Sequence, residues 1–448
     1  NRCDMNFKLP EKVNSIIKLL KANGYEAYAV GGCVRDMVMG IAPNDFDITT
    51  SALPEETMQV FKDYRIVETG VKHGTVTVIC DHEPFEITTY RIDGDYLDSR
   101  HPESVSFSRN LKDDLARRDF TVNTLCYNEE DGLIDLFGGV GDIENGLIRC
   151  VGDPEKRFSE DALRIMRALR FSATLGFSID GETARCIHSQ RDLLKNIAVE
   201  RIRDEFTKLL CGKKAFGVLS EFHDVIEVFI PEFAELFDCE QNTPYHVYDV
   251  GCHTLHALRA IENEKVLKIT MFFHDFGKPK AKFIDSHGVD HFKCHASIGA
   301  EMSREILKRM RYDNKTVEKV STLIAIHSEP SPKTKTDAKL LLSEVGEENY
   351  KDFIKVRRAD CLAKADPHSH DEKFKVMQAL LDEIIENNEC YRLSDLKIDG
   401  NDLIKLGFSD GKDISTALQI LFIEVLVDNE KNSKSYLASR AKALLEEI

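Results

Sequence analysis

The pattern of apolar and polar residues predicts a mixed α+β fold for the first third of the chain. Apolar residues recur at helical spacing within residues 10–24, at Val13, Ile16, Ile17 and Leu20, which predicts an amphipathic helix. Residues 28–30 and 45–48 have the character of short strands. Alternation within 74–80 and 84–90 predicts a β-hairpin, which we expect to lie beside the second of these strands.

Beyond this predicted sheet, the pattern is helical for most of the remaining length. Residues 113–123 form a helix-like run with two adjacent arginines. Within a helix predicted over residues 160–171, Asp161 and Arg164 lie one turn apart and face the same way. The sequence therefore predicts an α+β chain in which an N-terminal domain is followed by all-helical parts. The expected boundaries are 1–145, 146–212, 213–365 and 366–448.

The candidate chemistry of the N-terminal domain is concentrated between Tyr28 and Thr50. Gly31 and Gly32 lie between a strand and a short helix, where unpaired backbone N–H groups and the positive helix end suit a phosphate. In the strand that follows, a side-chain period of two places Asp45 and Asp47 on one face. Two adjacent carboxylates repel each other unless a cation lies between them, so the pair predicts a Mg²⁺ site. The alternative is a surface hairpin with solvated aspartates.

A phosphate site followed closely by an Asp-x-Asp strand indicates metal-assisted phosphoryl or nucleotidyl transfer. Three further features have two interpretations each. Glu86 is either a third metal-binding carboxylate or an exposed residue of an edge strand. Arg117 and Arg118 either hold a triphosphate and ribose or pair with two neighbouring aspartates. Asp161 and Arg164 either read the edge of cytosine or adenine or form an ordinary salt bridge.

Composition narrows the possible classes of protein. A net charge of −17 argues against a protein that coats nucleic acid non-specifically, although a local basic patch could still bind a nucleic-acid substrate. No apolar run approaches the length of a membrane span, and the first ten residues do not resemble a signal peptide. Twelve cysteines are scattered without CxxC pairs, which predicts buried free thiols in a reducing cytoplasm.

Four motifs, in this order and spacing, resemble the class II tRNA nucleotidyltransferases and the related bacterial poly(A) polymerases. They are Gly31-Gly32-x-Val34-Arg35-Asp36, Asp45-x-Asp47, Arg117-Arg118-Asp119-Phe120-Thr121-x-Asn123 and Glu160-Asp161-x-x-Arg164. Arg201-Ile202-Arg203-x-Glu205-Phe206 looks like a further helix of that family. The resemblance covers residues 20–210. It implies a polymerase-beta-like nucleotidyltransferase sheet in residues 1–145 and a nucleotide-selecting neck in residues 146–212.

The resemblance also implies roles for individual residues. The catalytic carboxylates, with Mg²⁺ as their ion, would be Asp45, Asp47 and Glu86. The residues implied in nucleotide binding are Gly31, Gly32, Arg35, Arg118, Asp119, Asn123, Asp161, Arg164 and Arg167. Among these, Asp161 and Arg164 match the protein template that selects CTP and then ATP. The polar segment 93–107 matches the flexible loop linked to this switch, and its full length argues against an enzyme that adds only the two cytidines.

A second set of candidate ligands lies in the helical part of the chain. His274 and Asp275 are adjacent at the end of an apolar helix, where both would be costly to bury unless a metal bound them. Together with His253 and Asp360 they resemble the HD superfamily of metal-dependent phosphohydrolases. This resemblance implies a divalent transition metal, which would be Ni, Mn, Co or Fe. The candidates for a second metal are His295 and His327, although a single histidine is more often a surface or core residue.

The sequence therefore predicts a cytoplasmic enzyme that adds CCA to the 3′ end of tRNA from CTP and ATP, without a nucleic-acid template and away from membranes. The HD part, residues 213–365, would trim a 2′,3′-cyclic phosphate or a 3′-phosphate. The tail, residues 366–448, would contact tRNA. One alternative is an A-adding enzyme or a poly(A) polymerase, which we rank lower because the C-terminal end lacks a basic extension. Another is an HD phosphohydrolase whose N-terminal domain only binds tRNA. The oligomeric state is unknown from sequence.

Overall fold

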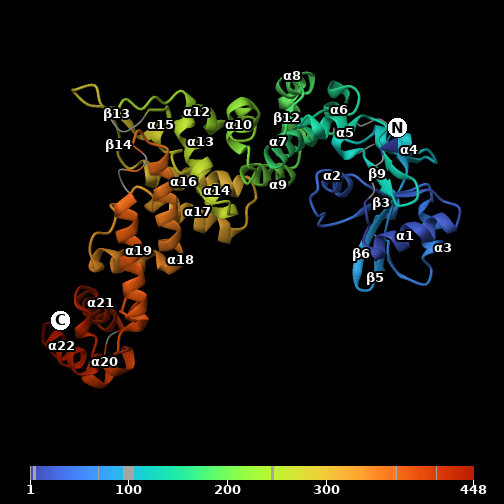
Figure 1. The fold of residues 1–448 in the computed structure, drawn as a ribbon. Coiled ribbons are helices and arrows are strands. Elements are labelled where there is room, and N and C mark those ends of the chain that lie inside the picture. The colour runs from blue at the N-terminus through green and yellow to red at the C-terminus, as the bar shows by residue number, and fades with distance from the viewer. Residues whose placement is uncertain are drawn as a thin grey trace. The chain divides into compact units, whose positions relative to one another are not determined.

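The computed structural model describes residues 2–3, 7–68, 70–93, 105–243, 247–366, 368, 371–409 and 411–447. The chain divides into two compact units, Asn1–Pro231 and Glu232–Ile448 (Figure 1). The first contains the sheet and the second is helical, so the predicted α+β class with a helical C-terminal half is confirmed. No helix in the described part of the chain is long and apolar enough to cross a membrane. The finer boundaries at 145, 212 and 365 stay predictions.

The N-terminal unit is built on an eight-stranded mixed sheet in the order β1-β10-β9-β2-β3-β6-β5-β4. Its strands are β1 (Arg2–Cys3), β2 (Ala27–Val30), β3 (Asp47–Thr50), β4 (Arg65–Val67), β5 (Thr75–Cys80), β6 (Glu83–Thr89), β9 (Cys126–Asn128) and β10 (Gly132–Ile134). The predicted hairpin, β5 with β6, is confirmed, and β6 lies parallel to β3. The strand expected to start at Asp45 begins instead at Asp47. Asp47 pairs with Val30, the last residue of β2, so the residues before Asp47 have no partner on that strand.

Helices cover this sheet on both faces. The predicted first helix is confirmed as α1 (Glu11–Ala22), and the four apolar residues named for it are all buried. They share a core with alternate residues of the central strands, among them Ala29, Ile48 and Ile87. Tyr28 and Val30 point to the opposite face and pack with α4 (Leu111–Ala116). The other helices here are α2 (Gly32–Val38), α3 (Pro54–Val60) and α5 (Gly139–Glu144).

The rest of the N-terminal unit is mainly helical. Its helices are α6 (Pro154–Glu160), α7 (Leu163–Leu175), α8 (Gly181–Gln190), α9 (Val199–Leu210), α10 (Ala215–Glu221) and α11 (His223–Ile226), with a short sheet of β11 (Leu147–Ile148) and β12 (Ser178–Ile179). Two predicted helices are interrupted. The helix expected over 160–171 is broken because Asp161 has extended backbone angles and separates α6 from α7. The run over 113–123 is broken because Phe120 is extended after the end of α4.

The predicted loop over residues 93–107 lies mostly outside the described residues. Its flanks form a small antiparallel sheet of β7 (Arg91–Asp93) and β8 (Val105–Phe107). The segment 94–104 between them is not described. Its link to nucleotide choice therefore stays a prediction.

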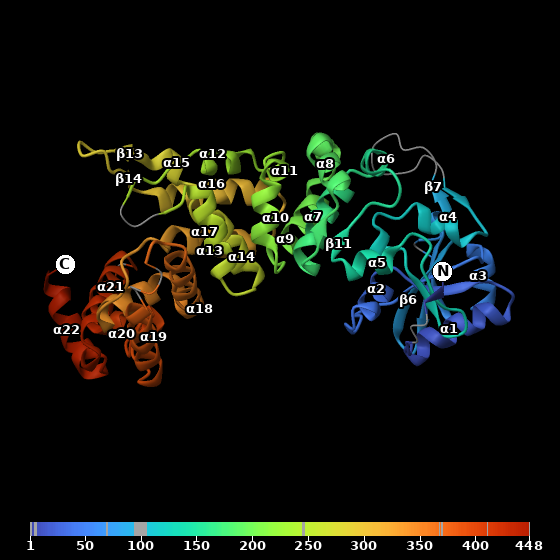
Figure 2. The ribbon, with the colours of Figure 1, turned by 45° about the horizontal axis from the view of Figure 1, so that its top comes forward.

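In its described residues, the C-terminal unit is helical apart from a hairpin of β13 (Lys282–Ile284) and β14 (Asp290–Phe292). Its helices are α12 (Ala234–Phe237), α13 (Val250–Ala260), α14 (Lys265–Phe273), α15 (Lys278–Ala281), α16 (His295–Arg309), α17 (Asn314–Ile326), α18 (Lys335–Leu362), α19 (Asp371–Glu386), α20 (Gly400–Leu406), α21 (Gly411–Val427) and α22 (Lys434–Glu447). Helix α14 packs against α13, α17 and α18, and α16 packs against α17 (Figure 2). Helices α20 to α22 enclose a core of their own.

Candidate active site and metal centre

A cavity of about 470 Å³ in the N-terminal unit brings together nearly all the nucleotide-site residues predicted from the sequence. The predicted residues that line it are Gly31, Gly32, Arg35, Asp45, Asp47, Arg118, Asp119, Asn123, Asp161, Arg164 and Arg167. Arg117, Arg170 and Phe171 also line it. The β2–α2 turn, the start of β3, the segment after α4 and the α6–α7 region therefore meet around one space.

The Gly-Gly turn holds two arginines beside the cavity. Gly31 has a φ of 82°, and a Cβ there would lie 3.1 Å from Nη1 of Arg118. Glycine thus permits both the left-handed backbone and the close approach of this guanidinium. Arg35 donates from Nη1 to Oδ1 of Asn123 at 2.8 Å and from Nη2 to Oδ1 of Asp36 at 2.7 Å. Two cationic groups are therefore fixed where the sequence predicts a phosphate.

Two of the predicted catalytic carboxylates, Asp45 and Asp47, line this cavity, and all three line a neighbouring one. Ile48 of β3 lies opposite Ile87 of β6, so Glu86 lies alongside Asp47. Both line a second cavity of about 740 Å³ together with Asp45. Partial desolvation and the charges of Asp45 and Glu86 raise the pKa of Asp47 against the opposing effect of a nearby arginine. Carboxylates that repel one another in this way suit a divalent cation such as Mg²⁺.

Arg117 and Arg118 form ion pairs, as one interpretation of the sequence predicted, while their contact with a triphosphate and ribose stays a prediction. Both pair with the fully buried Asp114 of α4, at 2.7 Å and 3.3 Å. Burial raises the pKa of Asp114, but the two arginines outweigh it and the net pKa is lowered. Because both arginines also line the cavity, this pairing fixes cationic groups that face it.

Asp119 connects the sheet domain to α7. Its side chain accepts from Nε of Arg167 at 2.8 Å and from Nδ2 of Asn123 at 3.1 Å. Burial raises the pKa of Asp119, but Arg167 and Asn123 lower it more strongly, to about 2. The carboxylate is therefore ionised at neutral pH and holds two other predicted site residues in place.

Arg164 is held rigidly at the start of α7. Its Nη1 donates to the carbonyl oxygen of Arg157 at 3.0 Å and to Glu160 at 2.8 Å, and its Nη2 donates to the carbonyl oxygen of Arg117 at 2.9 Å. Glu160 is the last residue of α6 and Arg164 belongs to α7, so this salt bridge links the two helices. Asp161, the extended residue after α6, lies 3.5 Å from Arg201 and lines the same cavity. Asp161 and Arg164 thus line one cavity, but they do not belong to one helix.

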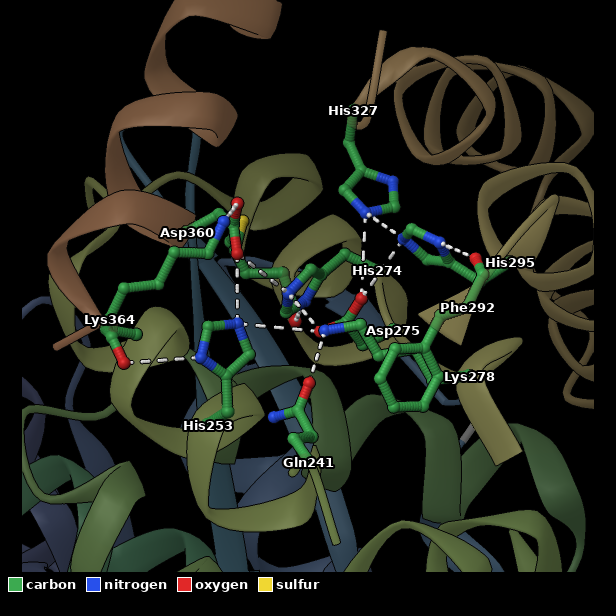
Figure 3. Close-up of polar contacts among 12 residues, drawn as sticks. Gln241, His253, His274, Asp275, Lys278, Phe292, His295, His327, Asp360 and Lys364 are labelled. Carbon is green, nitrogen blue, oxygen red and sulfur yellow. Dashed lines mark hydrogen bonds and ion pairs between the residues drawn. The ribbon is translucent and has the colours of Figure 1, made fainter. Parts of the chain in front are cut away.

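The C-terminal unit contains a buried cluster of all six HD-type candidates (Figure 3). One ligand group consists of His253, His274, Asp275 and Asp360, and the other of Asp275, His295 and His327. They come from α13, the end of α14, the first residue of α16, the end of α17 and the last turns of α18. Within each group, the candidate ligand atoms lie within 4.8 Å of one another.

The four histidines of the cluster use their two ring nitrogens in the same way. Each places Nδ1 against a backbone carbonyl oxygen, 2.6 to 3.3 Å away. The carbonyls belong to Ala363, Met271, Phe292 and Ile324, for His253, His274, His295 and His327 respectively. A carbonyl oxygen can only accept, so Nδ1 carries a proton and Nε2 faces the cluster, where its lone pair is available to a metal ion when the ring is neutral. This arrangement is typical of histidine ligands of metals.

Asp275 lies between the two ligand groups. Its Oδ2 is 3.2 Å from Nε2 of His274 and 3.5 Å from Nε2 of His253. Its Oδ1 is 3.6 Å from Nε2 of both His295 and His327. One carboxylate therefore offers a separate oxygen to each group, which is the arrangement of a ligand shared by two metal ions.

Three buried atoms of this cluster lack a hydrogen-bond partner. Among the described residues, they are Nε2 of His274 and both carboxylate oxygens of Asp275, although Oδ2 forms an ion pair with Lys278. Burial lowers the pKa of His274, but Asp275 and Asp360 outweigh it and raise the pKa to about 9. Unpaired buried polar atoms are costly, and divalent metal ions would satisfy them, so the residues present fit the implied ions.

Gly277 brings the two halves of the cluster together. A Cβ at this position would overlap the carbonyl oxygen of His295 and lie 2.5 Å from the amide nitrogen of Gly299. These are backbone atoms of α16, so no other residue fits without moving that helix. The glycine after Asp275 thus allows the segment to contact the helix whose first residue is His295.

Known proteins resemble this chain over nearly its whole length. Family models match residues 27–149 (Poly A polymerase head domain), 176–236 (Probable RNA and SrmB- binding site of polymerase A) and 290–441 (tRNA nucleotidyltransferase domain 2 putative). The CCA-adding enzyme of Geobacillus thermodenitrificans is 36% identical over 367 residues, which cover 82% of this chain and 81% of the relative. The chain belongs to the CCA-adding enzyme family.

Other members of the CCA-adding enzyme family match in part or in fold. The enzyme of Lactobacillus helveticus is 46% identical over 231 residues, 51% of this chain and 57% of the relative. The chain spans about half the length of the first curated relatives it matches. The structure of the Bacillus stearothermophilus CCA-adding enzyme in complex with CTP matches 99% of this chain and 100% of that chain, with a TM-score of 0.71 and 28% identity. The Thermotoga maritima enzyme complexed with tRNA matches in fold, with a TM-score of 0.61, 22% identity and coverage of 98% and 96%.

Sequence reasoning missed several charged residues of this CCA-adding family member. Lys278 lies 2.7 Å from Oδ2 of Asp275, and Lys364 lies 2.6 Å from Oδ2 of Asp360. The signal was their spacing, three and four residues after a candidate ligand, which is one helical turn. Arg170 of the nucleotide cavity was also missed. A similar signal was present, since Arg170 lies one helical turn after Arg167, another arginine that lines the cavity.

Proposed function

We propose that this member of the CCA-adding enzyme family adds CCA to the 3′ end of tRNA from CTP and ATP, without a nucleic-acid template. The main observation behind the proposal is the 470 Å³ cavity, where catalytic carboxylates, the Gly-Gly turn and the candidate base-reading pair line one space. The relative of known structure that was solved in complex with CTP supports a nucleotide as the occupant.

The charged residues around the cavity suit the phosphates of a nucleoside triphosphate and the metal ion that accompanies them. Asp45, Asp47 and Glu86 would hold Mg²⁺, which when bound activates the attacking hydroxyl and neutralises the charge of the leaving group. Arg35 and Arg118 lie at the Gly-Gly turn and provide charge-assisted hydrogen bonds to phosphate oxygens. The 3′ oxygen of tRNA then forms a bond to the α-phosphorus as the bond to the β-phosphate breaks, and pyrophosphate leaves.

Arg164 and Asp161 are proposed to select the base. An arginine donates to a ring nitrogen and a carbonyl, and a carboxylate accepts from an exocyclic amine, a combination that cytosine and adenine both satisfy. Glu160 and two backbone carbonyls fix the guanidinium of Arg164, so little orientation remains to be lost when a base binds. The protein can therefore take the place of a nucleic-acid template.

Primer extension tests this proposal. A single tRNA is prepared lacking CCA, lacking CA and lacking only A, and CTP and ATP are supplied singly and together. Growth of the first form by three nucleotides, and no further, is the expected result. Extension of only the last form by one A would indicate an A-adding enzyme, and a long A ladder on any RNA would indicate a poly(A) polymerase.

The site assignment is tested by replacing Asp45 and Asp47 with Ala. Loss of several kcal/mol of charge stabilisation corresponds to a rate decrease of more than about a thousandfold. The matched control is Asp63→Ala, which removes an exposed aspartate of the same unit and should leave the rate unchanged. Wild-type incorporation by the double variant would refute the assignment.

The buried cluster favours a second function, metal-dependent hydrolysis of a phosphoester. The observation behind it is the set of three buried ligand atoms, one on His274 and two on Asp275, that lack hydrogen-bond partners in the described residues. The expected substrate is a 3′-phosphate or a 2′,3′-cyclic phosphate on RNA, and the expected metal is Ni, Mn, Co or Fe. Metal analysis of wild type and Asp275→Ala, combined with phosphate release from such RNA, tests this function. Wild type that binds no divalent metal would rule it out.

Two further expectations belong to the proposal. We expect the tail, residues 366–448, to contact tRNA, since a family model for tRNA nucleotidyltransferases includes most of it. We also expect the protein to work in the cytoplasm, where its free cysteines would stay reduced.

A further inference from the structure

Two lysines contact the carboxylates of the buried cluster from outside the ligand set (Figure 3). Nζ of Lys278 lies 2.7 Å from Oδ2 of Asp275, and Nζ of Lys364 donates to Oδ2 of Asp360 at 2.6 Å. The oxygen that Lys278 contacts also faces His253 and the rest of the first ligand group. Each ammonium group therefore occupies a position beside an oxygen that a metal ion would also use or approach.

The surroundings of Lys278 keep its amine inside the site. Its side chain is 6% exposed, and Nζ also donates to Oε1 of the buried Gln241 at 2.7 Å. Nζ lies 5.5 Å from the centre of the Phe292 ring, and the carbonyl of Phe292 orients His295 of the second ligand group. Lys278 thus borders both ligand groups. Lys364 is more open, with 26% of its side chain exposed.

The charges of these groups change when metal ions bind. Without metal, the carboxylates of Asp275 and Asp360 each form an ion pair with a lysine. Two divalent ions would add four positive charges and would compete with the lysines for the carboxylate oxygens. The lysines then lose their anionic partners while they remain beside the metal ions. The metal-loaded site would therefore carry an excess of positive charge, which an anion with more than one negative charge would balance.

We propose that Lys278 and Lys364 bind the phosphate of the substrate when metal ions hold Asp275 and Asp360, and that the site therefore prefers a dianionic phosphomonoester to a monoanionic diester. The proposal rests on the metal-dependent hydrolysis proposed above. It narrows the expected substrate to an RNA end that carries a terminal phosphate. A 2′,3′-cyclic phosphate has only one negative charge and would bind less tightly.

Calorimetry on the full chain loaded with Mn²⁺ tests the proposal. Inorganic phosphate serves as the dianionic probe, and dimethyl phosphate serves as the monoanionic probe. Wild type should bind phosphate at least about tenfold more tightly than dimethyl phosphate, since a charge-assisted hydrogen bond is worth about one tenfold step or more in affinity. Lys364→Met should remove most of this preference, and Lys364→Arg should keep it.

A separate titration with Mn²⁺ distinguishes phosphate binding from a structural role. If Lys364 only supported Asp360, Lys364→Met would weaken Mn²⁺ and phosphate binding together. On our proposal, Mn²⁺ binds the variant at least as tightly as wild type, because a competing cation has been removed, while phosphate binding falls. The matched control is Lys355→Met on the same helix, where the lysine pairs with Glu262 at 3.0 Å, and it should change neither affinity.

Lys278→Gln provides a second variant in case Lys364→Met does not fold. Like Lys364→Met, it should bind Mn²⁺ at least as tightly as wild type and phosphate less tightly. Unchanged phosphate affinity in the folded variants, with Mn²⁺ bound, would overturn the inference but leave the metal centre intact. Wild type that binds no Mn²⁺ would overturn the metal centre itself, and with it the inference. Neither result affects the nucleotidyltransferase proposal, which depends on the other unit.

Discussion

Replacing Gly277 with Ala should open one of the two ligand groups of the buried cluster and so remove one of the two metal ions that we propose it binds. The added Cβ would overlap the carbonyl oxygen of His295 and lie 2.5 Å from the nitrogen and 3.0 Å from the Cα of Gly299. Unstrained carbon contacts are about 3.5–4.0 Å, so the first turn of α16 would have to retreat by about 1 Å. His295 is the first residue of that helix, and its Nε2 is already 3.6 Å from Asp275. The second ligand group would therefore open, while the first, which has no residue on α16, would stay together.

The expected cost of the substitution is about 1–3 kcal/mol in the free energy of unfolding of the C-terminal unit, as for other overpacked sites. The assay is metal analysis after dialysis against Mn²⁺, in which wild type should retain two ions per chain and Gly277→Ala one. Gly400→Ala is the matched control, because its Cβ would meet only a side-chain methyl carbon at 3.5 Å. If Gly277→Ala retained two ions at wild-type affinity and stability, the reasoning from close backbone approach would be refuted.

Three further predictions concern single side chains. Asp119→Asn should destabilise the N-terminal unit by about 2 kcal/mol at neutral pH, since the pKa of Asp119 is lowered from 3.8 to about 2. A lowered pKa stabilises the fold at pH values above the pKa of the unfolded state. The difference in unfolding free energy between the variant and wild type should therefore shrink as pH falls from 4 to 2, as measured by urea unfolding with hydrogen exchange as the readout. Arg164→Met should lower kcat/KM for both CTP and ATP by at least about tenfold in single-nucleotide incorporation, through loss of its donors; equal activity would exclude Arg164 from base selection. Phe272→Ala should destabilise the C-terminal unit by about 3–5 kcal/mol in thermal unfolding, since this ring is fully buried among other aromatic residues.

Local patterns were sufficient to predict much of the fold and most residues of the nucleotide cavity. Helix α1 follows from its apolar spacing, and the β5–β6 hairpin from its alternation. The Gly-Gly turn and the Asp-x-Asp pair are close together in the sequence, so their residue types alone indicate the chemistry. More distant members of the cavity, such as Asp119, were found only through resemblance to a family, because spacing alone does not indicate which segments meet.

The errors arose where distant partners decide the backbone. Asp45 lies outside β3 because β2 ends opposite Asp47, and the sequence of the strand itself gives no sign of that limit. Asp161 interrupts a run with helical spacing, and its extended backbone separates α6 from α7. Lys364 lies one helical turn after Asp360, but so do many lysines that face solvent, and only the fold shows its amine against that carboxylate.

Among the described residues, the nucleotide cavity is lined by the first compact unit and the metal cluster is formed by the second. Substitutions can therefore accumulate at one site without compensating changes at the other. A chain that has lost the histidines of the cluster can retain the nucleotide cavity unchanged, and the reverse also holds. Relatives of this protein can accordingly be sorted by two independent tests, the presence of Asp45 and Asp47 and the presence of His274 and Asp275. Agreement in the first test does not imply agreement in the second.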